Sequence, residues 1–154
     1  MDESPVLKSQ TPAVAARVYR TEILVRFRDC DPAGIVFYPR YLEMFNNLVE
    51  DWLRDEVRLP FSEIINTRGW GLPTVHLEVD FKAPSSFGES LAAEMVVSTL
   101  GSSSVTLSIG LRGPDGRERV HGKLVLVLID AKQNRSMTIP DEIRQCISTF
   151  LVAD

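Results

Sequence analysis

The feature that most constrains the fold is a long amphipathic segment at residues 39–56. Its apolar side chains recur at helical spacings and form one broad stripe: Tyr41, Leu42, Phe45, Leu48, Val49, Trp52 and Leu53. Pro39 suits the first turn of a helix, where its missing N–H breaks no hydrogen bond. The predicted helix is about 25 Å long. A stripe this wide needs a sheet to cover it.

The rest of the chain contains short strand-like runs. Residues 21–28 alternate between apolar and polar side chains, as a half-buried strand does. Further runs, separated by turn-rich segments, cover residues 72–83, 90–100, 103–113 and 117–130. Short helices are predicted at residues 60–68, ended by Gly69, and at residues 141–151.

The predicted order is therefore a strand, a long helix and a meander of four strands. The last two connections between strands are short enough for hairpins, so we expect antiparallel strands. The economical packing is an α+β hotdog fold, in which one curved antiparallel sheet of about five strands wraps around a long central helix. Such a sheet leaves an edge and its outer face uncovered, which predicts a homodimer or a homotetramer.

Length and charge limit the possible functions. The 154 residues fit one domain, predicted at residues 21–154, after a polar N-terminal tail at residues 1–20. The net charge of -4 argues against nucleic acid and membrane as partners, so an anionic ligand needs a local cluster of Lys or Arg. Two cysteines without a CxxC pair, and no recognisable secretion signal or membrane span, predict a reduced, cytoplasmic protein.

The chemistry is expected in the segment before the long helix. It reads Asp29-Cys30-Asp31-Pro32-Ala33-Gly34-Ile35-Val36-Phe37-Tyr38-Pro39-Arg40-Tyr41. N–H groups at a helix N-terminus are free and carry partial positive charge. A carboxylate that attacks or activates water, next to donors for an oxyanion, suits attack on a thioester. From position alone, an Asx-turn or a helix cap is the competing interpretation of Asp31.

This run resembles the signature of the 4-hydroxybenzoyl-CoA thioesterase family. The similarity extends from about residue 21 to about residue 130 and includes Arg68-Gly69, Pro73 and the run from Asp80 to Pro84. The resemblance implies a hotdog fold and hydrolysis of an acyl-CoA thioester. It implies no metal and no redox cofactor.

The resemblance also implies roles for individual residues. Asp31 would be the catalytic nucleophile or general base, and the backbone N–H of Tyr38 would polarise the thioester carbonyl. Pro32 and Gly34 would shape the turn that aims Asp31, so Gly34 is placed with the substrate-binding residues. Cys30 is not expected to be the nucleophile, because no histidine lies nearby in sequence to activate it.

Three further residues are candidates for the acyl pocket. Asn46, on the long helix, can donate or accept a hydrogen bond with a ring substituent, although it can equally face solvent. Trp70 lies between two glycines and can line a pocket. His76 follows a turn that lies near the pocket in relatives, although a satisfied strand histidine is the default interpretation.

The coenzyme's phosphates have no obvious partner. Some relatives carry adjacent basic residues in the turn where this chain has Gly101-Ser102-Ser103-Ser104. We therefore expect the phosphates to be held loosely or by a basic residue elsewhere: Arg112, Arg117, Arg119 or Lys123.

We predict a thioesterase for a small acyl group, of the aromatic 4-hydroxybenzoyl type. Short-chain aliphatic acyl-CoA and a non-catalytic acyl-CoA binding module are the alternatives. A phosphatase with an Asp-x-Asp motif is disfavoured because Arg26 and Arg28 interrupt the preceding strand, which such enzymes bury fully. A hydratase is disfavoured because its loop pairs a carboxylate with a histidine, and no histidine lies between Thr21 and Val75.

Overall fold

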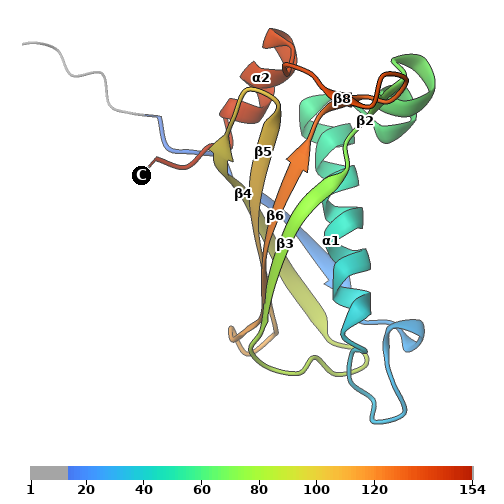
Figure 1. The fold of residues 1–154 in the computed structure, drawn as a ribbon. Helices are drawn as coiled ribbons and strands as arrows, with labels where there is room; N and C mark the ends of the chain where they lie inside the picture. Colours follow the sequence, from blue (N-terminus) through green and yellow to red (C-terminus); the bar gives the residue numbers. More distant parts are fainter. Residues whose placement is uncertain (1–13, 154) are drawn as a thin grey trace, which may run out of the picture.

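Helix α1, Pro39–Trp52, lies against one face of a five-stranded antiparallel sheet (Figure 1). The computed structural model describes residues 14–153. The strands of the main sheet are β1 (Tyr19–Leu24), β3 (Thr74–Phe81), β4 (Ser90–Leu100), β5 (Ser104–Arg112) and β6 (Glu118–Val127). A small sheet of β2 (Trp70–Gly71), β7 (Ile129–Asp130) and β8 (Arg135–Ser136) and a second helix, α2 (Asp141–Ser148), lie at the opposite end of the molecule from the start of α1 (Figure 1).

The predicted long helix is confirmed. The buried side chains of α1 are Tyr41, Met44, Phe45, Leu48, Val49 and Trp52. Met44 was not part of the predicted stripe, and Leu42, which was, is only half-buried. The helix continues as a π-helical turn at Leu53–Val57 and ends at Arg58, whose φ of 61° is left-handed. The helix approaches the sheet closely at Gly122 of β6, where a Cβ would lie 2.5 Å from the Phe45 ring.

The order of strands corrects the predicted meander. The order in the sheet is β1-β4-β5-β6-β3, so only β4, β5 and β6 follow one another as neighbours. Strand β3 pairs with β6 and forms one edge, while β1 pairs with β4 at the other edge. The long connection from Phe81 to Ser90 allows the chain to leave one edge and re-enter beside β1. A hotdog fold with a central helix and five antiparallel strands is therefore confirmed.

The first strand is displaced from its predicted position. It covers Tyr19–Leu24 instead of residues 21–28, and Phe27–Asp29 forms a 3-10 turn. The alternating pattern continues past Leu24, but the Asp29 carboxylate accepts a hydrogen bond from the Arg26 N–H at 2.8 Å, which folds the chain into the turn. Of the predicted tail at residues 1–20, residues 1–13 lie outside the described part of the chain.

The two short helical predictions are confirmed. A π-helical turn spans Glu63–Thr67, and Gly69 follows it with a φ of 65°. Helix α2 packs Ile147 into the core. No helix within residues 14–153 is long and apolar enough to cross a membrane.

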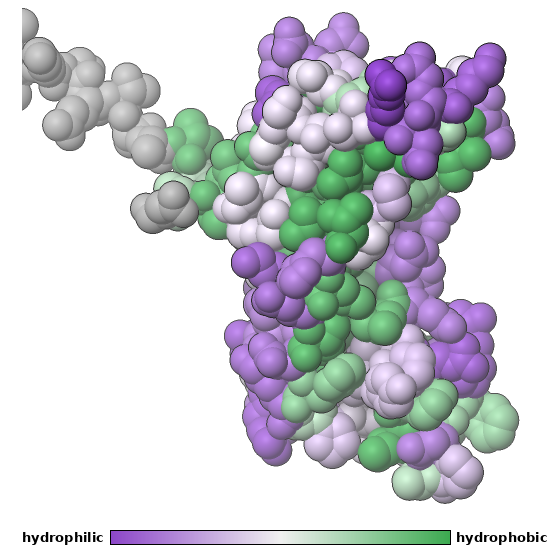
Figure 2. All heavy atoms as spheres, in the orientation of Figure 1, coloured by the Kyte–Doolittle hydropathy of each residue, from purple (hydrophilic) through white to green (hydrophobic). Residues whose placement is uncertain are grey.

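Strand β3 leaves an apolar edge exposed. Val75 is 58% exposed, Leu77 40% and Phe81 52%. Figure 2 shows an apolar band that runs down the molecule along this strand. An exposed edge strand has unpaired backbone groups and is a template for another strand.

Candidate functional site

The turn that carries Asp31 is closed by its own backbone. The Asp31 N–H donates to the Ile35 carbonyl and the Gly34 N–H donates to the Asp31 carbonyl, both at 2.9 Å. Gly34 has a φ of 78°, a left-handed conformation that residues with a side chain rarely adopt. The turn-shaping role expected of Gly34 therefore has a conformational basis. Figure 1 shows this segment projecting beyond the N-terminal end of α1.

The Asp31 carboxylate makes an Asx-turn and keeps one oxygen free. Its Oδ1 accepts a hydrogen bond from the Ala33 N–H at 2.9 Å. Within residues 14–153, Oδ2 has no hydrogen-bond or ion-pair partner. The competing interpretation of Asp31 as a turn residue is thus correct in geometry, yet it occupies only half of the carboxylate. The other oxygen remains available for a substrate or a water molecule.

The residues next to Asp31 are structural. Asp29 is buried and accepts the Arg26 N–H, and the Arg28 guanidinium lies 3.9 Å from its carboxylate. The Cys30 thiol donates to the Arg26 carbonyl. Burial, and then the Asp29 and Asp31 carboxylates, raise the pKa of Cys30, which disfavours the thiolate that a nucleophile requires.

The N-terminus of α1 offers a free backbone donor. Tyr38 is the residue before the helix, and no side chain caps it. Among the described residues the Tyr38 N–H has no acceptor. The hydrogen bond from the Phe37 N–H to the Asp29 carbonyl, 2.9 Å long, ties this point to the base of the Asp31 turn. A carboxylate and a free amide therefore stand on one segment that backbone hydrogen bonds close.

Aromatic rings surround this helix start. The Tyr38 ring lies 5.4 Å from the Phe37 ring and 6.0 Å from the Phe81 ring, measured between centroids. Phe81 also contacts Tyr41, at 5.9 Å. The rings of Phe37, Tyr38 and Phe81 are largely exposed, which is unusual for an apolar cluster without a ligand or a partner.

Two cavities lie between α1 and β3. The helix-start cavity, of about 290 Å³, is lined by Val36, Tyr38, Tyr41, Phe81, Lys82, Ala83 and Pro84. The mid-helix cavity, of about 220 Å³, is lined by Leu42, Phe45, Asn46, Val49, Phe61, Leu72, Thr74, Leu77, Leu124 and Leu126. Asp31 lines neither cavity.

The mid-helix cavity is apolar with two polar side chains. Asn46 and Thr74 contribute the polar groups, on α1 and β3 respectively. Asn46, which could have faced solvent, lines this cavity. Phe45 and Phe61 contribute aromatic faces. Sequence reasoning missed Thr74 and Phe61. Alternation along β3 from Leu77 would place Thr74 on the opposite face, but an irregularity between Thr74 and His76 shifts the register and brings Thr74 to the cavity.

The other two predicted pocket residues lie elsewhere. Trp70 is half-buried in β2, and the Arg68 guanidinium stacks over its ring at 4.8 Å. His76 is exposed and pairs across from Val125, whereas its neighbour Leu77 pairs across from Leu124 of the mid-helix cavity. His76 therefore points to the outer face of the sheet, where its Nε2 lies 3.0 Å from the Glu78 carboxylate.

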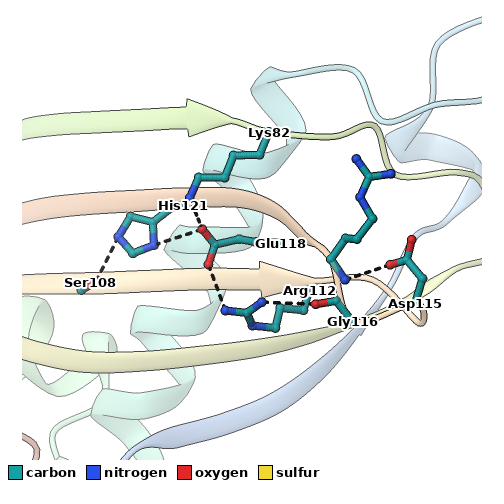
Figure 3. Close-up of polar contacts among 8 residues, drawn as sticks. Lys82, Ser108, Arg112, Asp115, Gly116, Glu118 and His121 are labelled. Atoms are coloured by element: carbon teal, nitrogen blue, oxygen red, sulfur yellow. Dashed lines mark hydrogen bonds and ion pairs between the residues drawn. The ribbon is translucent and has the colours of Figure 1, made fainter.

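The basic residues form a cluster around Glu118. Figure 3 shows the Glu118 carboxylate between Lys82, Arg112 and His121 on the outer face of the sheet. Arg119, in contrast, is only 8% exposed and pairs with Glu89 and Asp115, so it cannot meet a phosphate without leaving the interior. Among the four candidates for the coenzyme's phosphates, burial disfavours Arg119. Within residues 14–153, no group of three His, Cys, Asp or Glu side chains is arranged to hold a metal ion.

Comparison with known proteins gives the family. The model of the Thioesterase-like superfamily matches residues 25–147. The chain belongs to this superfamily. The narrower 4-hydroxybenzoyl-CoA thioesterase family, which the sequence resembles, is not established by that match and stays a prediction.

Several proteins similar to this chain are named for aromatic acyl-CoA substrates. A 1,4-dihydroxy-2-naphthoyl-CoA hydrolase of Synechocystis is 34% identical over 73 residues, which are 47% of this chain and 52% of that protein, so the match spans about half of each. A hydrolase of the same name from Nostoc punctiforme is 27% identical over 81% of this chain and 83% of its own length. The structure of BH1999, a gentisyl-coenzyme A thioesterase, superposes with a TM-score of 0.72 at 29% identity, covering 86% of this chain and 99% of that one.

Proposed function

We propose that this protein hydrolyses the thioester of a hydroxylated aromatic acyl-CoA to the free acid and coenzyme A. The observation that carries the proposal is that the Asp31 Oδ2 and the Tyr38 N–H, both without a partner among residues 14–153, stand on one segment closed by backbone hydrogen bonds. Thioester hydrolysis is supported by the match to the Thioesterase-like superfamily and by similar proteins that are named hydrolases or thioesterases. The aromatic class is supported by the names of the similar proteins.

In the proposed mechanism the thioester carbonyl oxygen accepts the Tyr38 N–H at the positive end of α1. Asp31 either attacks the carbonyl carbon, which gives a mixed anhydride, or removes a proton from an attacking water. The C–S bond breaks, and coenzyme A leaves as a thiolate. In the anhydride route a water molecule then regenerates Asp31. Cys30 takes no part, because its thiol stays protonated.

The acyl group is proposed to occupy the mid-helix cavity. Its apolar walls and the rings of Phe45 and Phe61 favour an aromatic ring, since aromatic contacts are worth about 0.5–1.5 kcal/mol beyond the area they bury. Asn46 and Thr74 supply hydrogen-bond partners for ring hydroxyl groups. Because Asp31 lines neither cavity between α1 and β3, we propose that the site is completed between two copies that meet at the β3 edge.

A panel of thioesters tests the substrate class. The purified protein is assayed with 4-hydroxybenzoyl-, 1,4-dihydroxy-2-naphthoyl-, butyryl- and palmitoyl-CoA by release of the free thiol. We expect a higher kcat/KM for the aromatic substrates, by roughly tenfold because single pocket contacts discriminate only modestly. An aliphatic thioester hydrolysed tenfold faster than either aromatic one would refute the aromatic class, and no hydrolysis of any thioester would refute the enzyme.

A matched pair of helix variants tests the placement of the ring. Asn46→Leu removes the amide from the mid-helix cavity, and Asn47→Leu removes the neighbouring amide, which lines a cleft on the β1 side of the helix. We expect Asn46→Leu to lower kcat/KM for a hydroxylated ring by about 3- to 10-fold, the worth of one hydrogen bond, and to spare benzoyl-CoA. Equal effects of the two variants would place the ring elsewhere.

A further inference from the structure

The Asp31 turn rests on a second loop. Its Val36 N–H donates to the Ser85 carbonyl at 2.9 Å, and the Phe87 N–H donates back to the Gly34 carbonyl at 3.0 Å. Ser85 is fully buried, and its hydroxyl accepts a hydrogen bond from Tyr41 of α1 at 2.8 Å. The conformation of residues 82–89, here called the support loop, therefore sets where the Asp31 turn lies.

Glu89 closes the support loop with both carboxylate oxygens. Its Oε1 accepts the Ser86 N–H at 2.8 Å, and its Oε2 accepts a hydrogen bond from the Arg119 guanidinium at 3.0 Å. The Glu89 backbone pairs with Val25 at 2.8 Å, which anchors it to the end of β1. Glu89 thus joins the support loop to a fixed point in the sheet.

Arg119 holds both ends of the same loop. Its carbonyl accepts the Lys82 N–H at 2.8 Å and the Ala83 N–H at 3.2 Å, where the loop begins. Its guanidinium binds Glu89, where the loop ends. Gly113 leaves room for this guanidinium, because a Cβ at Gly113 would overlap it.

The pair is more buried than the other ion pairs of the described chain. The Arg119 side chain is 8% exposed and that of Glu89 21%, and the buried Arg119 Nε has no partner among residues 14–153. Burying a charge is costly, and a buried ion pair is weak evidence for stability. Its fixed geometry does, however, specify one conformation of the loop that it joins.

We propose that Arg119 and Glu89 are positioning residues that hold Asp31 in its reactive position through the support loop. This inference rests on the proposed catalytic function of Asp31. Neither residue lines the two α1–β3 cavities, so each acts through backbone hydrogen bonds and not through contact with the acyl group. Displacing a reacting group by about 1 Å can lower a rate by about 10²-fold.

Kinetics separate positioning from binding. Glu89→Gln keeps the shape and removes the charge, while Glu94→Gln does the same to the exposed Arg20–Glu94 pair on the sheet's outer face and serves as the control. We expect Glu89→Gln to lower kcat at least tenfold with KM within twofold, and Glu94→Gln to change neither. Added to Asp31→Asn, Glu89→Gln should lower kcat no further. The inference would be overturned if Glu89→Gln left kcat unchanged, or if it lowered kcat as much in the Asp31→Asn variant as in the wild type.

Hydrogen exchange tests the same inference without activity. We expect the Val36 and Phe87 amides to be protected in the wild type, to exchange at least tenfold faster in Glu89→Gln and Arg119→Lys, and to be unaffected in Glu94→Gln. Arg119→Lys keeps a charge in the interior, so it is the milder variant if Glu89→Gln folds poorly. Unchanged exchange in both variants would refute positioning, whereas an inactive wild type would refute only the proposed function.

Discussion

At the scale of single residues, Asp31 shows how one carboxylate combines two roles. Its Oδ1 fixes the turn through the Ala33 N–H, and its Oδ2 stays available for chemistry. The Asx-turn orients the side chain, so the structural and the catalytic interpretations support each other. A carboxylate aimed by its own backbone needs no second side chain to orient it.

Replacing Asp31 separates these roles. Asp31→Asn retains an oxygen for the Ala33 N–H but removes the charge and the basicity, so we expect turnover to fall at least about 10²-fold while acyl-CoA binding is retained. Asp130→Asn is the matched control, because Asp130 Oδ1 accepts the Lys132 and Gln133 N–H groups in a similar turn remote from the site. Near-normal turnover of Asp31→Asn would reduce Asp31 to a turn residue.

The environment of Glu89 leads us to expect that the stability of the fold depends on pH. The Ser86 N–H, followed by the Arg119 guanidinium, holds the pKa of Glu89 below its usual range, against the opposing effect of burial. A depressed carboxylate pKa stabilises the fold above the unfolded pKa of about 4.3 and loses that effect as the pH falls through the folded pKa. Urea unfolding should show Glu89→Gln to be less stable by about 1–3 kcal/mol at pH 7. The difference should shrink below about pH 4; a difference independent of pH would contradict this.

At the scale of elements, periodicity predicted what each segment forms but not where it packs. The stripe of α1 and the run of β4 were found at their predicted residues because local pattern and burial agree. The local pattern did not predict the pairing of β3 with β6, because that pairing depends on contacts distant in sequence. It did not predict the end of β1 either, because the Asp29 turn ends that strand. The Asp31 segment was recognisable as a motif. Glu89 was not, because it stands in a turn-rich linker and acts through Arg119, thirty residues away.

The packing of α1 on β6 depends on a glycine, Gly122, at the point of contact with Phe45. Gly122→Ala places a Cβ 2.5 Å from the Phe45 ring, so the ring must move into the mid-helix cavity or the helix must shift. Overpacking of this kind costs about 1–3 kcal/mol. In Gly110→Ala, on β5, the nearest atom to the new Cβ is a Glu118 carboxylate oxygen at 3.3 Å, and we expect a smaller loss. Thermal unfolding of the two variants measures this difference in stability, and KM for an aromatic thioester shows whether the cavity changes. Equal melting temperatures for Gly122→Ala and Gly110→Ala would refute the expectation.

At the scale of the whole molecule, the uncovered edge at β3 predicts self-association. One chain exposes Val75, Leu77 and Phe81 along this edge, and its Asp31 lines no cavity between α1 and β3. Pairing two β3 edges would satisfy the free backbone groups and cover the apolar side chains. It would also bring a second copy to the cavities, which the proposed site requires.

Light scattering at micromolar concentration should therefore give twice or four times the mass of one chain. Val75→Lys places a charge on the β3 edge and should shift the mass toward the monomer, with loss of activity in the same concentration range. Leu24→Lys is the control, because Leu24 is an exposed apolar residue of β1, at the opposite edge, and should leave the mass unchanged. A monomeric wild type would remove the shared site. A monomeric Val75→Lys with full activity would show that one chain suffices for catalysis, since the cavities and the Asp31 turn would then act without a partner.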